Sequence, residues 1–478
     1  MPTLTRRTLL AAGAAALAPA LIGAAPRKRN VLFIASDDLN NSLGCYGDPL
    51  VQSPNIDRLA RMGVRFDRSY CQFPFCGPSR ASLMTGMAPD KTRVWDLQAN
   101  FRTAQPDAIT LPQLFRQNGY FTARAGKIYH YGVPDDIGTN GMDDKPSWQQ
   151  VVNPNGVDHT KEEPLLTVHT PTRAIGSSLA FHASAAPDNL HTDGLLAEAV
   201  IGMMEQHRSE PFFIGAGFYR PHVPFIAPSK YFDLYPLEKI EARPFKDSDM
   251  TIAPEWAFFT KPANWGLSVL QRREAIRAYY ASISFMDAQV GRLLDTLDRL
   301  KLTENTTIVF WGDNGYQLGE HGQWMKQTVF EAAARVPVII GGAGVSARGR
   351  GCGRTVELLD LYPTLADLCN LSAPPGQLAG KSLRPLLKNP AAAWDRPAIS
   401  QVLRTLPASP SRPTRVMGYS LRNERYRYSQ WNEGALGEEL YDYQNDPAEL
   451  HDLSRDERHL ALKASLRDRL IKIIAARQ

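Results

Sequence analysis

The sequence predicts an α/β protein with a mostly parallel sheet sandwiched by helices and a small antiparallel α+β unit at the C-terminus. Short apolar runs, such as residues 30–36 and 306–311, alternate with stretches of helical periodicity. This alternation is typical of parallel strands joined by crossover helices. After residue 396 it gives way to strands separated by short turns. We therefore expect a main domain over residues 26–395 and a C-terminal subdomain over residues 396–478.

The first 25 residues have the features of an export signal. Arg6 and Arg7 precede a short apolar run, and small residues at 23–25 offer a cleavage site. The run is shorter than the roughly 20 apolar residues that span a bilayer, although an N-terminal anchor remains the alternative. No later stretch is long and apolar enough to span. We expect a twin-arginine signal, a periplasmic or secreted protein, and no stable membrane insertion.

Composition and cysteine usage exclude some classes of protein. The net charge of +5 is small for 478 residues, and the basic residues are dispersed, so nothing indicates binding to nucleic acid. The five cysteines are odd in number and contain no C-x-x-C pair, so a disulfide framework is not expected. Proteins that fold in a reducing compartment before export keep free thiols. The cysteines expected to be ordinary buried residues are Cys45, Cys71, Cys352 and Cys369.

The first half of the main domain shows two strand-and-helix alternations. Residues 30–36 form an apolar run and predict a buried strand. Residues 55–62 have apolar side chains at helical spacing and stop at Gly63, after which residues 64–70 predict a strand. A further helix over residues 110–117 precedes a strand over residues 119–124.

The second half repeats the alternation after a long insertion. Residues 134–190 are rich in Pro, Asn, Asp and Gly, and we interpret them as an insertion over the sheet. An amphipathic helix over residues 195–207 precedes a buried strand over residues 211–218. A long helix over residues 272–300 then precedes the strand over residues 306–311.

The C-terminal subdomain is predicted from turns. Residues 398–402 lead into a polar, Pro-rich loop. Residues 415–431 predict two strands joined by a turn at residues 423–424, and residues 439–447 predict a third strand and turn. Helical sequence follows from about residue 456.

The segment Cys76-Gly77-Pro78-Ser79-Arg80 combines a modifiable sulfur with features of a helix start. Pro78 suits the first turn of a helix, where its missing N–H has no partner to lose. Cys76 would then lie at the helix N-terminus, where free N–H groups and the helix dipole stabilise negative charge. Arg80 lies one turn further and would point back to the same place. The structural alternative is a helix start with a buried cysteine.

Two polar pairs follow predicted strands and indicate a metal site. Asp37-Asp38 follows the strand over residues 30–36, and Asp313-Asn314 follows the strand over residues 306–311. Ligands in parallel α/β sheets collect at the carboxyl ends of the strands. Ligands that offer only oxygen suit Ca²⁺ or Mg²⁺ rather than zinc. Each pair alone could equally be a helix cap or a solvated turn.

Three further motifs place cations and histidines near predicted strand ends. Lys127 and His130 are three residues apart and can reach one site, although such pairs are usually at the surface. His222 lies in Arg-Pro-His-Val-Pro, where proline on either side stiffens the loop; a packed loop histidine is the alternative. Lys326 follows Asp313-Asn314 and offers a further cation. His321 lies between them, and the structural alternative for this histidine is that it does no more than support the loop.

Taken together, these motifs resemble a known enzyme family. The segment from Cys76 to Gly86 resembles the signature of type I sulfatases, which contain formylglycine. The segments similar to the iduronate-2-sulfatase branch of that family are Cys76–Arg80, Gly126–His130, Arg220–Phe225, Leu318–Lys326 and residues 439–447. The resemblance spans residues 30–452 and implies an alkaline-phosphatase-like fold, with the main domain as the catalytic domain.

The resemblance also implies a mechanism and a cofactor set. Cys76 would be oxidised to formylglycine by the formylglycine-generating enzyme before export, and the hydrated aldehyde would be the nucleophile. Asp37, Asp38, Asp313 and Asn314 would bind Ca²⁺ together with an oxygen of the modified Cys76. Arg80, Lys127 and Lys326 would stabilise the sulfate oxygens, His222 would protonate the departing sugar oxygen, and His130 would assist the final elimination. The implied substrate is a sulfated carbohydrate.

Two alternatives remain open from the sequence. The first is a phosphodiesterase or phosphonate monoester hydrolase of the alkaline phosphatase superfamily, because some of these enzymes share the cysteine motif and the metal ligands. The second is a non-catalytic binder of sulfated glycans, which would require an unmodified Cys76.

Overall fold

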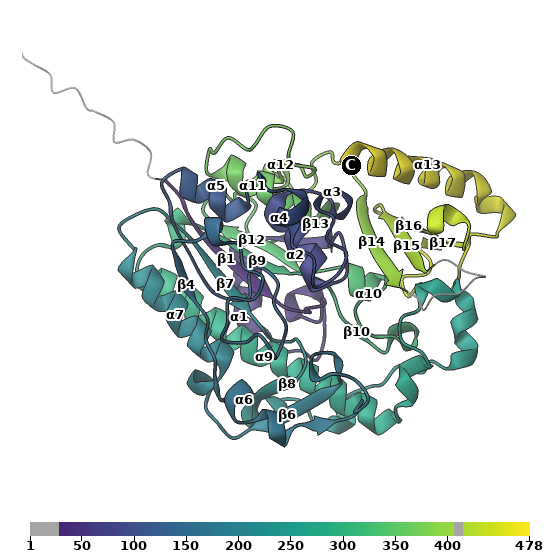
Figure 1. The fold of residues 1–478 in the computed structure, drawn as a ribbon, viewed down its shortest axis with the longest axis horizontal. Helices are drawn as coiled ribbons and strands as arrows, with labels where there is room; N and C mark the ends of the chain where they lie inside the picture. Colours follow the sequence, from purple (N-terminus) through teal and green to yellow (C-terminus); the bar gives the residue numbers. More distant parts are fainter. Residues whose placement is uncertain (1–27, 406–413) are drawn as a thin grey trace, which may run out of the picture.

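A computed structural model describes residues 28–405 and 414–478 of the chain (Figure 1). The predicted export signal lies outside the described residues. An eight-stranded sheet forms the centre, with strands in the order β13-β2-β12-β9-β1-β7-β3-β4. The strands are β1 (Asn30–Ser36), β2 (Gly63–Tyr70), β3 (Phe121–Gly126), β4 (Gln150–Val152), β7 (Phe212–Phe218), β9 (Thr306–Gly312), β12 (Val338–Gly342) and β13 (Arg350–Glu357).

The sheet is parallel except at one strand. β1 pairs in parallel with β7 and β9, and β3 pairs in parallel with β7 and β4. β12 runs antiparallel to both β2 and β9. The predicted mostly parallel sheet is therefore confirmed, and each of the five predicted strands of the main domain is present. The other three strands of this sheet, β4, β12 and β13, were not among the predicted strands.

The C-terminal unit contains a four-stranded antiparallel sheet, one strand more than predicted. Its strands are β14 (Ala398–Thr405), β15 (Arg415–Arg422), β16 (Tyr426–Trp431) and β17 (Glu438–Asp442). Helix α13 (Leu460–Arg477) lies across this sheet (Figure 1) and places Leu466 and Leu470 against Leu421 and Tyr428. The predicted antiparallel α+β unit is confirmed, while its exact boundary at residue 396 stays a prediction.

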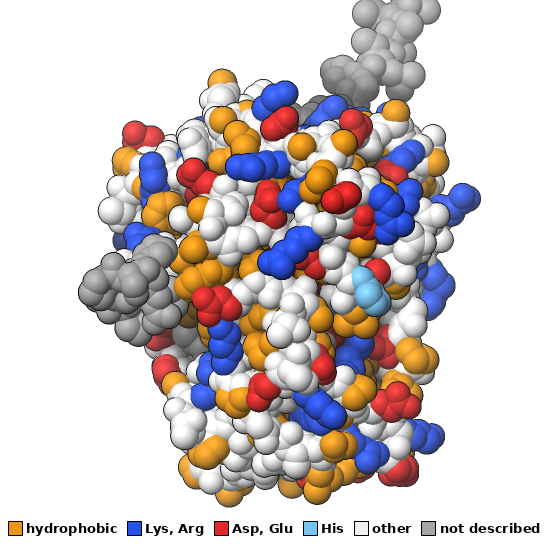
Figure 2. All heavy atoms as spheres, turned by 90° about the vertical axis from the view of Figure 1, so that its right-hand side faces the viewer, with side chains coloured by type: hydrophobic (Ala, Val, Ile, Leu, Met, Phe, Trp, Pro, Cys, Tyr) orange, Lys and Arg blue, Asp and Glu red, His pale blue; other side chains and the backbone are white. Residues whose placement is uncertain are grey.

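Positive and negative side chains are mixed on the molecular face that is shown in Figure 2. Figure 2 shows Lys and Arg side chains interspersed with Asp and Glu over the face that lies to the right in Figure 1. Within the described ranges, no helix combines the length and the hydrophobicity needed to cross a bilayer.

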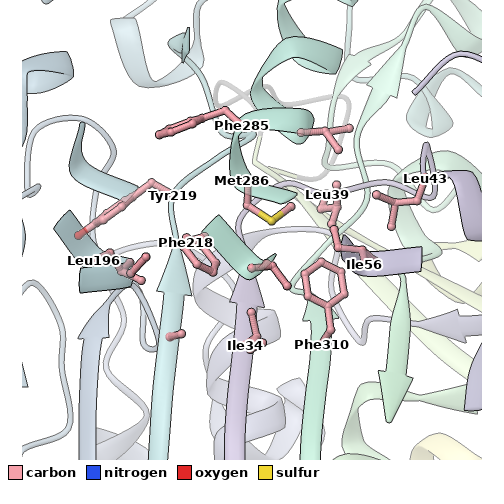
Figure 3. Close-up of a cluster of buried hydrophobic side chains, with 14 of the residues drawn as sticks. Ile34, Leu39, Leu43, Ile56, Leu196, Phe218, Tyr219, Phe285, Met286 and Phe310 are labelled. Atoms are coloured by element: carbon pink, nitrogen blue, oxygen red, sulfur yellow. The ribbon is translucent and has the colours of Figure 1, made fainter. Parts of the chain in front are cut away.

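Helices cover both faces of the central sheet, as predicted. Side chains of a strand alternate between the two faces, so Leu32 and Ile34 of β1 join one core and Val31 and Phe33 join the other. The first core packs against α1 (Pro54–Met62), α7 (Thr192–Gln206) and α9 (Val269–Arg299). Figure 3 shows part of it, where Ile34 and Phe310 lie beneath Met286. The second core packs against α2 (Cys76–Thr85), α5 (Leu111–Gln117) and α11 (Leu361–Leu368).

The insertion over residues 134–190 only partly matches the expectation. Most of it is irregular, but β4 pairs with β3 and so extends the central sheet instead of covering it. Two other strands of the insertion, β5 (Thr167–Val168) and β6 (Ala180–Ser184), form a small sheet with β8 (Phe225–Pro228). The remaining short elements are α3 (Pro89–Thr92), α4 (Phe101–Ala104), α6 (Val157–Thr160), α8 (Ser229–Phe232), α10 (Glu331–Ala334), α12 (Arg384–Lys388), β10 (Gln317–Leu318) and β11 (Trp324–Met325).

A charged cluster joins the C-terminal unit to the main domain. Glu331 of α10 pairs with Arg427 of β16 at 2.5 Å and with Arg422 of β15 at 3.4 Å. The hydroxyl of Tyr70 donates to the same carboxylate at 2.9 Å. Burial opposes ionisation of Glu331, but the charges of the two arginines outweigh it and lower its pKa to about 2.

We expect Glu331→Gln to lower the free energy of unfolding by about 2 kcal/mol at pH 7, because buried Arg422 loses its carboxylate partner and buried Arg427 is left with Glu449. The pKa of Glu331 is lower in the folded protein than the usual 4.5. Its stabilisation is therefore present above about pH 5 and is lost as the pH falls. Urea denaturation of both proteins should show a difference that shrinks between about pH 5 and pH 3. A difference that stays constant over this range would contradict the ion-pair explanation.

Candidate active site

The four predicted metal ligands meet at one edge of the sheet. β1 and β9 are neighbours in parallel register, with Ser36 opposite Gly312, so the residues that follow them are brought side by side. The backbone N–H of Asp38 donates to Asp313 Oδ1 at 3.0 Å, and Asn314 Nδ2 donates to Asp38 Oδ1 at 2.8 Å. Carboxylate oxygens of Asp37, Asp38 and Asp313 lie within 4.8 Å of one another. Three buried carboxylates this close require compensating positive charge.

Three cations supply that charge from three separate segments. Arg80 of α2 donates through Nε to Asp313 at 2.7 Å and lies 3.5 Å from Asp37. Lys127, directly after β3, pairs with Asp37 at 2.6 Å. Lys326, directly after β11, pairs with Asp38. The three cations and three carboxylates balance in number, so the site is close to neutral before any ligand binds.

Arg80 makes more contacts within the protein than the sequence predicts. Besides the two carboxylates, its Nη1 donates to the carbonyl oxygens of Lys127 and Ile128. These contacts hold Arg80 against the acidic cluster and the turn that carries Lys127, while its predicted contact with the sulfate oxygens stays a prediction. Gly217 of β7 allows this turn to pass close to the sheet, because a Cβ there would collide with the backbone of Lys127.

Cys76 begins helix α2, as predicted, and lies inside the charged cluster. Its Sγ is 2.9 Å from Lys326 Nζ and 3.6 Å from Asp38 Oδ1, and the side chain is only 1% exposed. The position at a helix N-terminus favours a thiolate. Burial and the charge of Asp37 nevertheless raise the pKa of the thiol well above its usual range, although Lys326 opposes them. The unmodified thiol is therefore protonated at neutral pH.

Two predicted histidines also face the cluster. Burial and the charge of Lys127 lower the pKa of His130 well below its usual range, and its buried Nδ1 has no hydrogen-bond partner among the described residues. Burial lowers the pKa of His222 to about 4, against the effect of Asp38. His222 Nδ1 lies 2.6 Å from the carbonyl oxygen of Val223, so Nδ1 carries the hydrogen of the neutral ring. Its bare Nε2 then faces Asp38 at 3.6 Å.

The loop that carries His222 is fixed by two aspartates that the sequence analysis did not identify. Arg220 Nη2 pairs with Asp158 at 2.8 Å, while its Nη1 donates to the carbonyl oxygens of His222 and Pro224. Asp193 accepts the backbone N–H groups of Tyr219 and Arg220 at 2.9 and 3.0 Å. Arg220 lay in a quoted motif, but Asp158 lies in the insertion, where no local pattern indicates its partner.

His321 takes no part in the cluster. Its Nε2 lies 2.9 Å from the carbonyl oxygen of Ala448 and 3.2 Å from that of Glu449. It therefore supports the loop after β9, which was the structural alternative stated for it.

The residues at the acidic cluster fit a hard divalent cation. Asp38 Oδ2 and Asn314 Oδ1 are buried and have no hydrogen-bond partner in the described part of the chain. Unsatisfied buried oxygens are costly, and a cation would satisfy them. Asp38 also adopts a φ of 60°, which is uncommon outside glycine and is typical of residues constrained at functional sites. An all-oxygen donor set is the type that binds Ca²⁺ or Mg²⁺.

Comparison with known proteins identifies the family. The sulfatase family profile matches residues 29–371, and the profile described as N-sulphoglucosamine sulphohydrolase, C-terminal, matches residues 319–476. The chain belongs to the sulfatase family. A sulfatase from Formosa agariphila is 33% identical over 441 residues, covering 88% of this chain and 82% of the relative. Human iduronate 2-sulfatase is 33% identical over 507 residues, covering 89% of this chain and 91% of the relative.

Solved structures share the fold at lower identity. The phosphonate monoester hydrolase of Agrobacterium radiobacter superimposes with a TM-score of 0.77 at 22% identity, covering 94% of this chain and 96% of that one. A protein solved in complex with D-glucosamine-2-N,6-O-disulfate superimposes with a TM-score of 0.71 at 20% identity, covering 94% and 98%. These similarities confirm the predicted alkaline-phosphatase-like architecture.

We expect Asp158→Asn to lower kcat/KM for a sulfate ester by about 10-fold or more, because displacing a catalytic group by even 1 Å is costly. The amide oxygen can keep the bonds from Thr192, but its NH₂ group would oppose Arg220 and loosen the His222 loop. The exposed Asp233→Asn is the matched control.

The double variant separates positioning from a general loss of stability. If Asp158 acts through the histidine, Asp158→Asn adds little further loss in a His222→Ala background. Fully additive losses would contradict this positioning role.

Proposed function

We propose that this protein hydrolyses sulfate esters of a sulfated carbohydrate, using a residue derived from Cys76. The observation that carries the proposal is the convergence of Cys76 with Lys127, Lys326, His130 and His222 over a charge-balanced acidic cluster. Relatives named iduronate 2-sulfatase, ulvan-active sulfatase and N-acetylglucosamine-6-O-sulfatase support a sulfated glycan as the substrate.

The proposal includes two groups that the chain itself does not contain. Asp37, Asp38, Asp313 and Asn314 would hold Ca²⁺, and the formylglycine-generating enzyme would convert Cys76 to formylglycine before export. When present, these groups supply a Lewis acid and a hydroxyl nucleophile. The buried, unpartnered oxygens of Asp38 and Asn314 support the metal, and the family signature around Cys76 supports the modification.

The lysines bind and orient the sulfate. Lys326 Nζ lies 2.9 Å from Cys76 Sγ, so it reaches any anion held at residue 76. Lys127 supplies a second ammonium group to the same cluster through its contact with Asp37 at 2.6 Å. Burial opposes the charge of Lys326, but Asp38 outweighs it and raises the pKa of this lysine well above its usual range. Lys326 is therefore fully charged at neutral pH, and its donors are arranged before the sulfate binds.

The two histidines move protons. Val223 fixes the hydrogen at Nδ1 of His222, which leaves Nε2 to accept a proton and pass it to the departing sugar oxygen. The pKa of His222, about 4 in the unliganded site, would rise when the anionic sulfate ester arrives, because nearby negative charge favours imidazolium. His130 has an unpartnered Nδ1 and a lowered pKa, so it is a neutral acceptor for the later deprotonation step.

Export through a twin-arginine signal at residues 1–25, to the periplasm or the medium, is part of the same proposal. Arg6 and Arg7 before a short apolar run support it. Five free cysteines support folding in a reducing compartment before export.

The phosphonate monoester hydrolase of similar fold defines the main competing function. Parallel assays on an aryl sulfate, an aryl phosphate diester and an aryl phosphonate distinguish the two. We expect the highest kcat/KM for the sulfate. A preference for either phosphorus ester would refute the sulfatase proposal.

Modification of residue 76 is tested by intact mass. We expect protein from a host that contains the generating enzyme to be lighter by about 18 Da at Cys76, as thiol becomes aldehyde. Cys76→Ser should abolish turnover with the fold intact, because one small polar residue replaces another at a helix start. If the serine variant shows no oxidation by mass and keeps wild-type activity, residue 76 is not the source of the nucleophile. If the wild-type protein keeps an unmodified Cys76 and binds sulfated glycans with full affinity, it is a non-catalytic binder.

Calcium binding is tested at Asp313. Asp313→Ala should lose both bound Ca²⁺ and activity, because the site loses a carboxylate and Arg80 loses the nearer of its two carboxylate partners. Elemental analysis of the purified variant, beside wild type and Asp233→Ala, measures the occupancy. Full occupancy in the Asp313 variant would exclude this residue as a ligand.

A further inference from the structure

A cleft of about 680 Å³ lies beside Cys76, between the main domain and the C-terminal unit. Its volume falls within the roughly 300–1,000 Å³ typical of small-molecule sites. Two of its lining residues are chain neighbours of the active-site cluster: Phe75 precedes Cys76 and Gln327 follows Lys326. The Phe75 ring centroid is 6.0 Å from Lys326 Nζ, and the backbone N–H of Gln327 donates to the carbonyl oxygen of Pro74. The inner end of the cleft therefore adjoins the proposed sulfate site.

Aromatic side chains line the walls of this cleft. Trp95 and Trp256 are partly exposed there, and Phe258 and Phe259 lie beside them. The indole N–H of Trp95 donates to Asp90 at 3.3 Å, which holds the ring in place. Fixed, partly exposed rings offer flat apolar surfaces with polar edges, and the C–H face of a sugar ring packs against such surfaces.

Two arginines from the C-terminal unit add positive charge. Arg404 of β14 donates to the carbonyl oxygens of Trp256, Gln327 and Ala257 and is only 8% exposed. Burial lowers the pKa of Arg404 to about 10, which still leaves it charged at neutral pH. The exposed Arg415 of β15 lies 5.5 Å from the Trp95 ring centroid.

The charged residues that line the cleft leave it with a small positive excess. Glu255 lies 3.9 Å from Lys261, and these two charges offset each other. Asp96 caps its own turn by accepting the backbone N–H groups of Gln98 and Ala99, but it keeps its negative charge. The two arginines therefore exceed the remaining carboxylate by one charge. An anionic ligand can neutralise this excess, and guanidinium groups suit oxyanions with several acceptor oxygens.

We infer that this cleft binds a second, anionic sugar residue of the substrate, next to the sugar whose sulfate is removed. The inference rests on the proposed function. A sugar ring with a sulfate or carboxylate substituent matches both the aromatic walls and the two arginines. The enzyme then acts on oligosaccharides in preference to monosaccharides, and the C-terminal unit contributes to substrate choice without supplying a group to the sulfate site.

The test compares substrates of different length. Wild type, Trp95→Ala and Arg415→Ala are assayed on nitrophenyl sulfate and on sulfated mono- and tetrasaccharides from heparin, chondroitin sulfate and ulvan. Arg458→Ala changes an exposed arginine of the same unit that does not line the cleft, and it is the control. Trp95→Phe and Arg415→Lys, which keep a ring and a charge, separate loss of the contact from loss of the fold.

We expect wild type to prefer a tetrasaccharide to its monosaccharide by about 10-fold or more in kcat/KM, a factor that one stacking or charged contact can supply. Trp95→Ala and Arg415→Ala should reduce this preference about 10-fold, and the conservative variants should retain part of it. The subsite is refuted if the variants lose as much kcat/KM on nitrophenyl sulfate as on the tetrasaccharide. It is also refuted if wild type shows no higher kcat/KM for any tetrasaccharide than for its monosaccharide. If wild-type protein that carries formylglycine at residue 76 hydrolyses no sulfate ester, nitrophenyl sulfate included, the proposed function itself is refuted.

Discussion

The balance of charge at the carboxyl ends of β1 and β9 is the constraint on which the rest of the site depends. Buried carboxylates at this distance repel one another and lose hydration, so each needs a partner that is equally fixed. The partners come from α2, from the turn after β3 and from the segment after β11. These three segments are therefore locked to the central strands by charge as well as by apolar packing. Removing the charge of Lys326, for example, would leave the buried Asp38 carboxylate without its lysine partner.

The parts of the fold that local pattern determines could be predicted from the sequence. The apolar runs of β1 and β9 end at acidic pairs, and the parallel-sheet rule brings those ends together. The start of α2 followed from Pro78. The sequence also contains a signal for an earlier start of α9 than the predicted residue 272. Ser268 and Gln271 form a capping box at the N-terminus of this helix.

Features that depend on distant partners could not be predicted in this way. The antiparallel direction of β12 arises from its pairing with both β2 and β9, and nothing within the strand specifies that direction. The link between Asp158 and Arg220 joins positions 62 residues apart. The protonated state of Cys76 is a further case: the helix N-terminus predicts a stabilised thiolate, but the depth of burial, which the sequence does not give, decides the outcome.

The C-terminal unit is anchored through Glu331, yet none of its described side chains joins the acidic cluster. Arg404 and Arg415 of this unit instead line the neighbouring cleft. Under the proposed subsite, the main domain supplies the reacting groups and the aromatic walls, while β14 and β15 supply the two arginines that face the flanking sugar. Substitutions of these arginines would then change which glycan is accepted while the reacting groups keep their surroundings. The charge preference of the enzyme could in this way evolve separately from its chemistry.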